Sequence, residues 1–222
     1  MAKSVVITGG TGGLGSAVTG ALLDEGWDVV VPWVAERELE RVTKHPALTL
    51  IQADLMDPAA VARVVDAVAS PLHAVVNLVG GFASGGRVHD TPLGDFEAQI
   101  RLNLYPGYLM CQAAIPRLMD IGGGSVVLVS SQATRRPFSG AAGYLTAKTA
   151  VLGLAAALHA EYERDGVRVN TILPNVIDTP ANREAQPDAD TSKWTTPEAI
   201  AETIVFLCSD ESAAVRGSQL MV

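Results

Sequence analysis

The chain has 222 residues, of which 48% are hydrophobic and 18% charged, the balance of a single globular domain. Its formal net charge of −8 argues against a face that binds nucleic acid. No basic segment followed by a long apolar run opens the chain, and the apolar segment 150–158 is too short to span a bilayer, so we expect a cytoplasmic protein. Its two cysteines and four histidines lack the spacing of a metal site or a redox motif, which predicts reduced thiols and no metal.

Short apolar runs typical of strands alternate along the chain with segments typical of helices. This alternation predicts an α/β fold with one doubly wound parallel sheet and helices on both faces. The chain shows no linker or repeat, so residues 1–222 are expected to form one domain. The predicted strands are Ser4–Thr8, Val29–Val31, Leu48–Gln52, Ala74–Leu78, Ser125–Val129, Arg168–Leu173 and Gln219–Val222; the predicted helices are Ser16–Glu25, Glu36–Thr43, Ala59–Ala69, Leu93–Met119, Tyr144–Glu163 and Pro197–Cys208.

A glycine-rich segment, Thr8-Gly9-Gly10-Thr11-Gly12-Gly13-Leu14-Gly15, joins the first predicted strand to the first predicted helix. Glycine permits positive φ and lets the backbone approach a pyrophosphate closely. The helix N-terminus that follows offers free N–H groups and a favourable dipole to an anion. An ordinary glycine-rich turn is the alternative, but a strand before the segment and a helix after it favour a dinucleotide site.

A second group of polar residues surrounds the predicted helix Tyr144–Glu163. Ser131 follows a predicted strand, and Tyr144 and Lys148 are four residues apart, hence on one face of the helix. A lysine ammonium near a phenol favours the phenolate, so we expect Lys148 to lower the pKa of Tyr144 toward neutrality. Such a tyrosine could exchange protons with a substrate. A lone Tyr-x-x-x-Lys pair is common on helix surfaces, so the prediction depends on the neighbouring motifs.

Taken together, Thr-Gly-x-x-x-Gly-x-Gly at Thr8–Gly15 and Ser131 thirteen residues before Tyr144-x-x-x-Lys148 resemble the short-chain dehydrogenase/reductase family over nearly the whole chain. The resemblance implies an NAD(P)-binding Rossmann fold and an enzyme that moves a hydride between NAD(H) or NADP(H) and a small carbonyl or alcohol. It implies that Tyr144 is the general acid/base, that Ser131 holds the substrate oxygen, and that Lys148 also binds the nicotinamide ribose. Asn103 would hold a water in a proton relay with that lysine.

The same resemblance implies the residues that would hold the cofactor. Gly9, Gly13 and Gly15 would line the diphosphate, Asp54 would contact the adenine, and Ile177 and Thr179 would hold the carboxamide. The full set is Gly9, Thr11, Gly13, Leu14, Gly15, Trp33, Asp54, Leu55, Asn77, Gly80, Tyr144, Lys148, Pro174, Ile177 and Thr179.

Three motifs depart from the family pattern. Trp33 falls where NAD-dependent members usually carry the acid that binds the ribose, and no arginine stands in the glycine loop, so the choice between NAD and NADP stays open. Arg37 is either a phosphate ligand or solvated surface. Only Asn77 and Gly80 match the motif after the fourth predicted strand. Asn175 replaces a glycine in the motif near the nicotinamide, a place where asparagine tolerates left-handed φ.

The C-terminal third raises further alternatives. The polar segment 181–196 is expected to be a lid over the substrate or else a disordered loop. Segments around Asp178 and Trp194, with the short C-terminus, resemble dihydropteridine reductases, yet that branch generally lacks a serine at the position of Ser131, so pterin reduction is a minority alternative. A dinucleotide-binding regulator without turnover is the other. The apolar, small-residue helix 149–158 predicts a homodimer or homotetramer joined through Leu104–Met119 and Ala147–Glu163.

Overall fold

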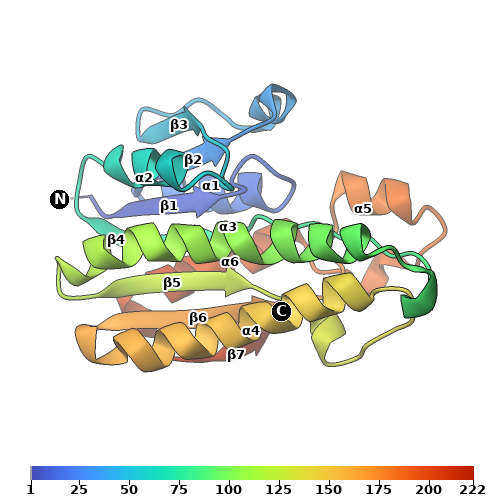
Figure 1. The fold of residues 1–222 in the computed structure, drawn as a ribbon. Helices are drawn as coiled ribbons and strands as arrows, with labels where there is room; N and C mark the ends of the chain where they lie inside the picture. The colour runs from blue at the N-terminus through green and yellow to red at the C-terminus, as the bar shows by residue number, and fades with distance from the viewer. Residues whose placement is uncertain (1) are drawn as a thin grey trace.

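Seven parallel strands form a single sheet in this computed structural model, which describes residues 2–222. Their order across the sheet is β3-β2-β1-β4-β5-β6-β7, so the chain winds outward from β1 in one direction and then from β4 in the other (Figure 1). The predicted doubly wound sheet is therefore confirmed. The strands are β1 (Ser4–Thr8), β2 (Asp28–Trp33), β3 (Leu48–Gln52), β4 (Leu72–Asn77), β5 (Gly124–Val129), β6 (Val167–Leu173) and β7 (Gln219–Met221).

Helices cover both faces of the sheet. One face carries α2 (Pro58–Asp66), α3 (Leu93–Met119) and α4 (Ala142–Tyr162), and the other carries α1 (Gly15–Asp24) and α6 (Pro197–Cys208). In Figure 1, α3 and α4 lie side by side across the near face, and the short α5 (Pro180–Ala185) projects beyond the ends of the strands. Among residues 2–222, no helix combines the length and the apolar character that a membrane crossing needs.

The core has two layers because successive strand residues point to opposite faces of the sheet. Val6, Val75 and Val126 face α2, α3 and α4, whereas their neighbours Val5 and Val76 face α1 and α6. All of these side chains are essentially inaccessible to solvent. Central strands of this kind are buried on both faces, which is why they are continuous apolar runs in the sequence rather than alternating ones.

Three helices begin in the same way, with a polar capping side chain followed by proline. The Asp57 carboxylate accepts a hydrogen bond from an N–H of the first turn of α2, and the Thr179 and Thr196 hydroxyls do so for α5 and α6. The proline that follows each cap occupies the first position of the helix, where a backbone N–H would have no acceptor within the helix, so the missing N–H costs nothing. The cap at Thr179 places α5 directly above the carboxyl edge of the sheet, where ligands bind in open α/β folds.

Two sequence predictions differ from the structure. Residues 36–43 were expected to form a helix, but the chain forms the short 3₁₀ helix η1 (Glu36–Arg41) with no buried residue. The segment 181–196 was expected to be a loop, yet it contains most of α5 and the 3₁₀ turn η5 (Thr191–Lys193). Another 3₁₀ turn, η3 (Gln132–Thr134), follows β5.

Candidate active site

The glycine-rich segment forms a tight turn between β1 and α1. Gly9 has a φ of 70°, and a Cβ added there would lie 3.0 Å from the Val79 nitrogen. At Gly15 the added atom would lie 1.9 Å from the Gly9 carbonyl oxygen. Gly15 therefore closes the turn against its own backbone, and any contact with a cofactor would come from its peptide group. At Gly13 a Cβ would lie 3.0 Å from the Thr179 Cγ2, so this glycine lies directly beneath the start of α5.

The turn also presents free donors. Among the backbone hydrogen bonds of the described residues, the N–H groups of Gly13 and Leu14 have no acceptor, whereas those of Gly12 and Ser16 do. Both free groups lie just before the first residue of α1, where the helix dipole is positive. The segment therefore fits the diphosphate that the sequence predicts, through two N–H donors at a helix N-terminus and glycines that leave room for it.

The residues predicted to contact the adenosine differ in which of their atoms a cofactor could reach. Trp33 ends β2, and its carbonyl accepts a hydrogen bond from Ala53 at 3.0 Å. Asp54 is exposed, and its carboxylate accepts a hydrogen bond from the Met56 N–H at 2.9 Å, a local turn. The Leu55 side chain is only 7% exposed and belongs to the core, so its backbone alone is available to a cofactor.

Asn77 proves to be an interior side chain. Its Oδ1 accepts a hydrogen bond from the Thr8 hydroxyl at 3.3 Å, and its Nδ2 donates to the Cys111 sulfur at 3.7 Å. The amide therefore connects β1, β4 and α3 within the core, and a role toward the cofactor would fall to the peptide groups that follow it. Burial raises the pKa of the Cys111 thiol to about 12, as it does for Cys208, so both thiols stay protonated.

Ser131 and Tyr144 come together as predicted. Ser131 caps η3, and Tyr144 lies in the first turn of α4. Burial raises the pKa of Tyr144 above its ordinary value, and the nearby Ser131 hydroxyl offsets part of this effect. The Phe82 ring meets the Tyr144 ring edge-on, with centroids 5.0 Å apart, and accounts for part of that burial. The pKa of Tyr144 therefore shifts upward, opposite to the lowering expected from Lys148, and its removal from water is the largest cause.

Lys148 is buried one helical turn beyond Tyr144, with 6% of its surface exposed. Its Nζ lies 5.9 Å from the centroid of the Tyr144 ring and donates a hydrogen bond to the Val129 carbonyl at 3.2 Å. No salt bridge to Lys148 occurs among residues 2–222. Burial therefore lowers the pKa of this lysine to about 8.

Asn103 lies beside the lysine, held by the loop after β4. Its Oδ1 accepts a hydrogen bond from the Gly81 N–H at 3.1 Å, and its Nδ2 donates to the Gly81 carbonyl at 3.0 Å. A Cβ on Gly80 would lie 2.8 Å from the Asn103 Oδ1 and 2.9 Å from the Lys148 Nζ, so a side chain at position 80 would displace one or both of these groups. A void of about 10 Å³ borders Asn77, Asn103 and the Val129 backbone region, roughly the space that one buried water needs.

The predicted nicotinamide-side residues form a compact turn after β6. The Pro174 carbonyl accepts a hydrogen bond from the Gln132 N–H at 2.9 Å, which joins this turn to η3 and Ser131. The Ile177 carbonyl accepts hydrogen bonds from the Thr179 N–H and the Asn182 side chain, both at 2.8 Å. Thr179 is 8% exposed and faces Gly13, so the carboxyl edge of β6 meets the glycine loop.

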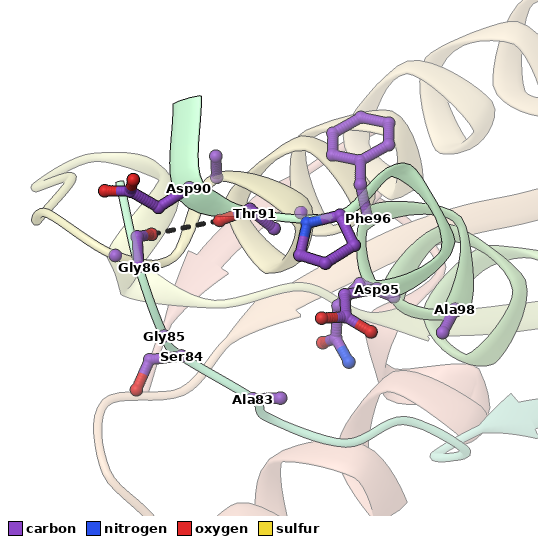
Figure 2. A pocket seen from close by; sticks show the side chains of 14 residues that line it. Ala83, Ser84, Gly85, Gly86, Asp90, Thr91, Asp95, Phe96 and Ala98 are labelled. Carbon is purple, nitrogen blue, oxygen red and sulfur yellow. Dashed lines mark hydrogen bonds between the residues drawn. The ribbon is translucent and has the colours of Figure 1, made fainter. Parts of the chain in front are cut away.

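A cavity of about 270 Å³ opens beside the first turn of α4 (Figure 2). Its walls come from the loop after β4, the start of α3 and the segment just before Tyr144. The lining residues are Ala83, Ser84, Gly85, Gly86, Asp90, Thr91, Pro92, Asp95, Phe96, Ala98, Gln99, Gly140, Ala142 and Gly143. Within residues 2–222, no group of three or more His, Cys, Asp or Glu residues could hold a metal ion.

Three further residues contribute to this site through contacts that the sequence did not specify. Gly81 fixes Asn103 through two hydrogen bonds, and Phe82 packs on Tyr144. Glu38 reaches the glycine loop from η1. Gly81 directly follows the predicted site residue Gly80, so its neighbourhood could be expected, but no sequence pattern indicated that η1 would fold back onto Thr11.

Comparisons with known proteins cover the whole chain. A family model described as enoyl-(acyl carrier protein) reductase matches residues 9–222. D-threitol dehydrogenase of Mycolicibacterium smegmatis is 30% identical over 99% of this chain and 91% of its own length. A short-chain type dehydrogenase/reductase from Mycobacterium ulcerans superposes with a TM-score of 0.91 at 26% identity, covering 99% of this chain and 88% of that one.

ElxO, solved with NADP bound, has the same fold at 23% identity and a TM-score of 0.92, covering 100% of this chain and 97% of its own. The matched residues include most of the glycine loop, the motifs that follow β4 and β6, and α4. With sequence, sheet order and length all in agreement, the chain belongs to the short-chain dehydrogenase/reductase family of enzymes.

Proposed function

We propose that the protein transfers a hydride between a nicotinamide cofactor and a small carbonyl or alcohol substrate, with Tyr144 as the general acid/base. The observation that carries the proposal is the convergence of Ser131, Tyr144 and Lys148 beyond the carboxyl end of β5. The cofactor, when bound, supplies or accepts the hydride, so the side chains have only to position groups and move a proton.

Each side chain has a role that its surroundings support. In the reducing direction the Tyr144 hydroxyl gives its proton to the substrate oxygen, and its raised pKa keeps that proton on the phenol until it is needed. The Ser131 hydroxyl, already near the phenol, holds the same oxygen. The Lys148 ammonium then stabilises the phenolate that is left. Asn103 and the small void beside it would let a water return a proton to this group.

We propose NAD(H) or NADP(H) as the cofactor, with its diphosphate on the free N–H groups of Gly13 and Leu14. Thr179 and the Ile177 backbone would hold the nicotinamide end, since the turn after β6 lies across from the glycine loop. Asp54 and Trp33 lie at the carboxyl ends of β3 and β2 and would border the adenosine.

The test is Tyr144→Phe, assayed with a panel of ketones and secondary alcohols. Loss of the phenolic proton should lower kcat by about 10²–10⁴-fold, while cofactor affinity measured by fluorescence titration stays within about threefold. Tyr162→Phe is the matched control, because Tyr162 is the last residue of α4, at the opposite end of that helix from Tyr144. A Tyr144→Phe enzyme with wild-type kcat would remove Tyr144 from the proton-transfer step.

Two other activities receive less support. Pterin reduction has the resemblance of the Asp178 and Trp194 region in its favour, but Ser131 next to Tyr144 suits a carbonyl or alcohol better, as does the similarity to D-threitol dehydrogenase. A regulator that binds the cofactor without turnover would not need a tyrosine, a serine and a buried lysine in one place. Cofactor binding with no oxidation of NADH or NADPH by any carbonyl or quinonoid pterin would favour the regulator.

We also propose that residues 181–196 act as a lid on the cofactor and substrate. Thr179, the cap of α5, contacts Gly13, and Arg183 pairs with Asp178 at 2.7 Å between Nη2 and Oδ2, which fixes the base of the segment. The tip is exposed, so it can move while its base stays in place. Slower proteolysis within 181–196 when cofactor is added would support the lid, and an unchanged rate would argue against it.

A further inference from the structure

A carboxylate lies beside the glycine loop, although it does not come from the end of β2, where the family usually carries it. β2 ends in Trp33 without an acid. Five residues later, Glu38 of η1 folds back, and its Oε2 accepts a hydrogen bond from the Thr11 hydroxyl of the glycine loop at 2.7 Å. Glu38 is half-buried and Thr11 is 2% exposed, so this contact holds the carboxylate against the loop rather than out in solvent.

We infer that Glu38 recognises the 2′-hydroxyl of the adenosine ribose and makes the enzyme prefer NAD(H) over NADP(H). The inference rests on the proposed cofactor site. A carboxylate has about four lone-pair positions, and the Thr11 bond uses one, which leaves acceptors for a ribose hydroxyl. A 2′-phosphate at the same place would bring two anions together, which costs affinity for NADP(H).

The neighbouring arginines do not offset the repulsion between Glu38 and a 2′-phosphate. Arg37 and Arg41 belong to the same 3₁₀ helix, but both are exposed and form no hydrogen bond or salt bridge with the glycine loop among residues 2–222. The loop itself has Gly12 where an arginine could have neutralised a phosphate. The carboxylate is thus the only charged side chain with a hydrogen bond to this part of the loop within the described residues.

The test compares the dissociation constants of NADH and NADPH, measured by nicotinamide fluorescence without substrate, for the wild type, Glu38→Gln and Glu40→Gln. We expect the wild type to bind NADH at least tenfold more tightly than NADPH. Glu38→Gln should reduce that ratio by about tenfold, mostly by strengthening NADPH binding, because the amide removes the repulsion. Glu40→Gln, an exposed change on the same 3₁₀ helix, should leave the ratio within twofold.

Thr11→Val serves as a second variant, since it removes the hydroxyl that holds Glu38 but keeps the carboxylate. It should reduce the NADH preference by a smaller factor, about threefold. A wild type that prefers NADPH, or a ratio that Glu38→Gln leaves unchanged, would overturn the inference. Failure of the wild type to bind either nucleotide would instead overturn the proposed cofactor site, so the two failures are distinguishable.

Discussion

Lys148 carries an energetic cost in the free protein. Its ammonium is buried beside Tyr144 with the Val129 carbonyl as its hydrogen-bond acceptor and no carboxylate partner among residues 2–222. A buried cation that lacks an anionic partner is destabilising, which is why the pKa falls to about 8. Natural sites commonly give up stability for function in this way.

The residue-scale prediction is that Lys148→Met stabilises the cofactor-free protein at pH 7. The folded pKa of about 8 lies below the unfolded value near ~10.4. Below pH 8 both states hold the proton, and the folded state bears the full cost. Between the folded and the unfolded pKa of Lys148, the unfolded state binds more protons than the folded state, so wild-type stability rises with pH. We expect Lys148→Met to add about 1–3 kcal/mol to the free energy of unfolding at pH 7, allowing for the lost hydrogen bond.

Urea unfolding at pH 7 and pH 10 measures this effect. The advantage of Lys148→Met should shrink at pH 10, where the wild-type lysine is mostly neutral in the folded state. Lys44→Met, a change at an exposed lysine, should alter stability by less than about 0.5 kcal/mol at both values. A Lys148→Met protein that is less stable than wild type at pH 7 would mean that the lysine is stabilising as a cation.

At the scale of a single element, two glycines of the same helix differ in how much space surrounds them. Gly15 and Gly20 both belong to α1, but an added Cβ meets backbone 1.9 Å away at Gly15 and nothing within 4 Å at Gly20. We expect Gly15→Ala to lower the free energy of unfolding by more than about 2 kcal/mol, because the clash is with rigid backbone. Gly20→Ala should raise it by about 0.5–1 kcal/mol through better helix propensity.

Thermal unfolding of the two variants separates packing from propensity. Gly15→Ala should also lose cofactor affinity, since the turn that holds the N–H groups of Gly13 and Leu14 would have to move. Gly20→Ala should keep it. Equal melting temperatures for the two variants would contradict the close approach between Gly15 and the Gly9 carbonyl.

Element boundaries were predictable where a long period or a strong cap marked them. Leu93–Met119 and Pro197–Cys208 match α3 and α6 to the residue. The prediction missed α5 although Thr179-Pro180 gives the same cap as Thr196-Pro197. A six-residue helix has too few turns to show an apolar period, so only its cap could have revealed it.

The site was predictable wherever a motif fixes both residue type and position. Ser131 lies near Tyr144, Tyr144 near Lys148 and Lys148 near Asn103. The strand and helix patterns placed the first three on neighbouring elements, whereas Asn103 was singled out only by the family resemblance. The surroundings of these side chains were less predictable than their positions on the elements. Neither the raised pKa of Tyr144 nor the contact of Glu38 with Thr11 follows from spacing, because both depend on how segments far apart in sequence pack.

At the scale of the whole molecule, the outer face of α3 and α4 stays exposed. On α3, Leu102, Tyr105 and Tyr108 are 42%, 41% and 49% exposed. On α4, the small residues Gly153 and Ala157 are exposed as well, together with Ala156. A loop of the same chain could in principle cover this face, but none does so within residues 2–222, because these side chains are exposed.

We propose that a second copy covers this face, with α3 and α4 packing against their equivalents as a homodimer or half of a homotetramer. Small residues let two helices approach closely, and a self-complementary contact about a two-fold axis is the commonest arrangement. Light scattering should therefore give a mass of at least twice the 23.2 kDa chain at micromolar concentration. Ala157→Arg should shift the mass toward 23.2 kDa without altering the circular dichroism spectrum, since the side chain has room in the monomer. Ala185→Arg, exposed on α5, should leave the mass unchanged, and a wild type of 23.2 kDa throughout a tenfold dilution series would exclude the oligomer.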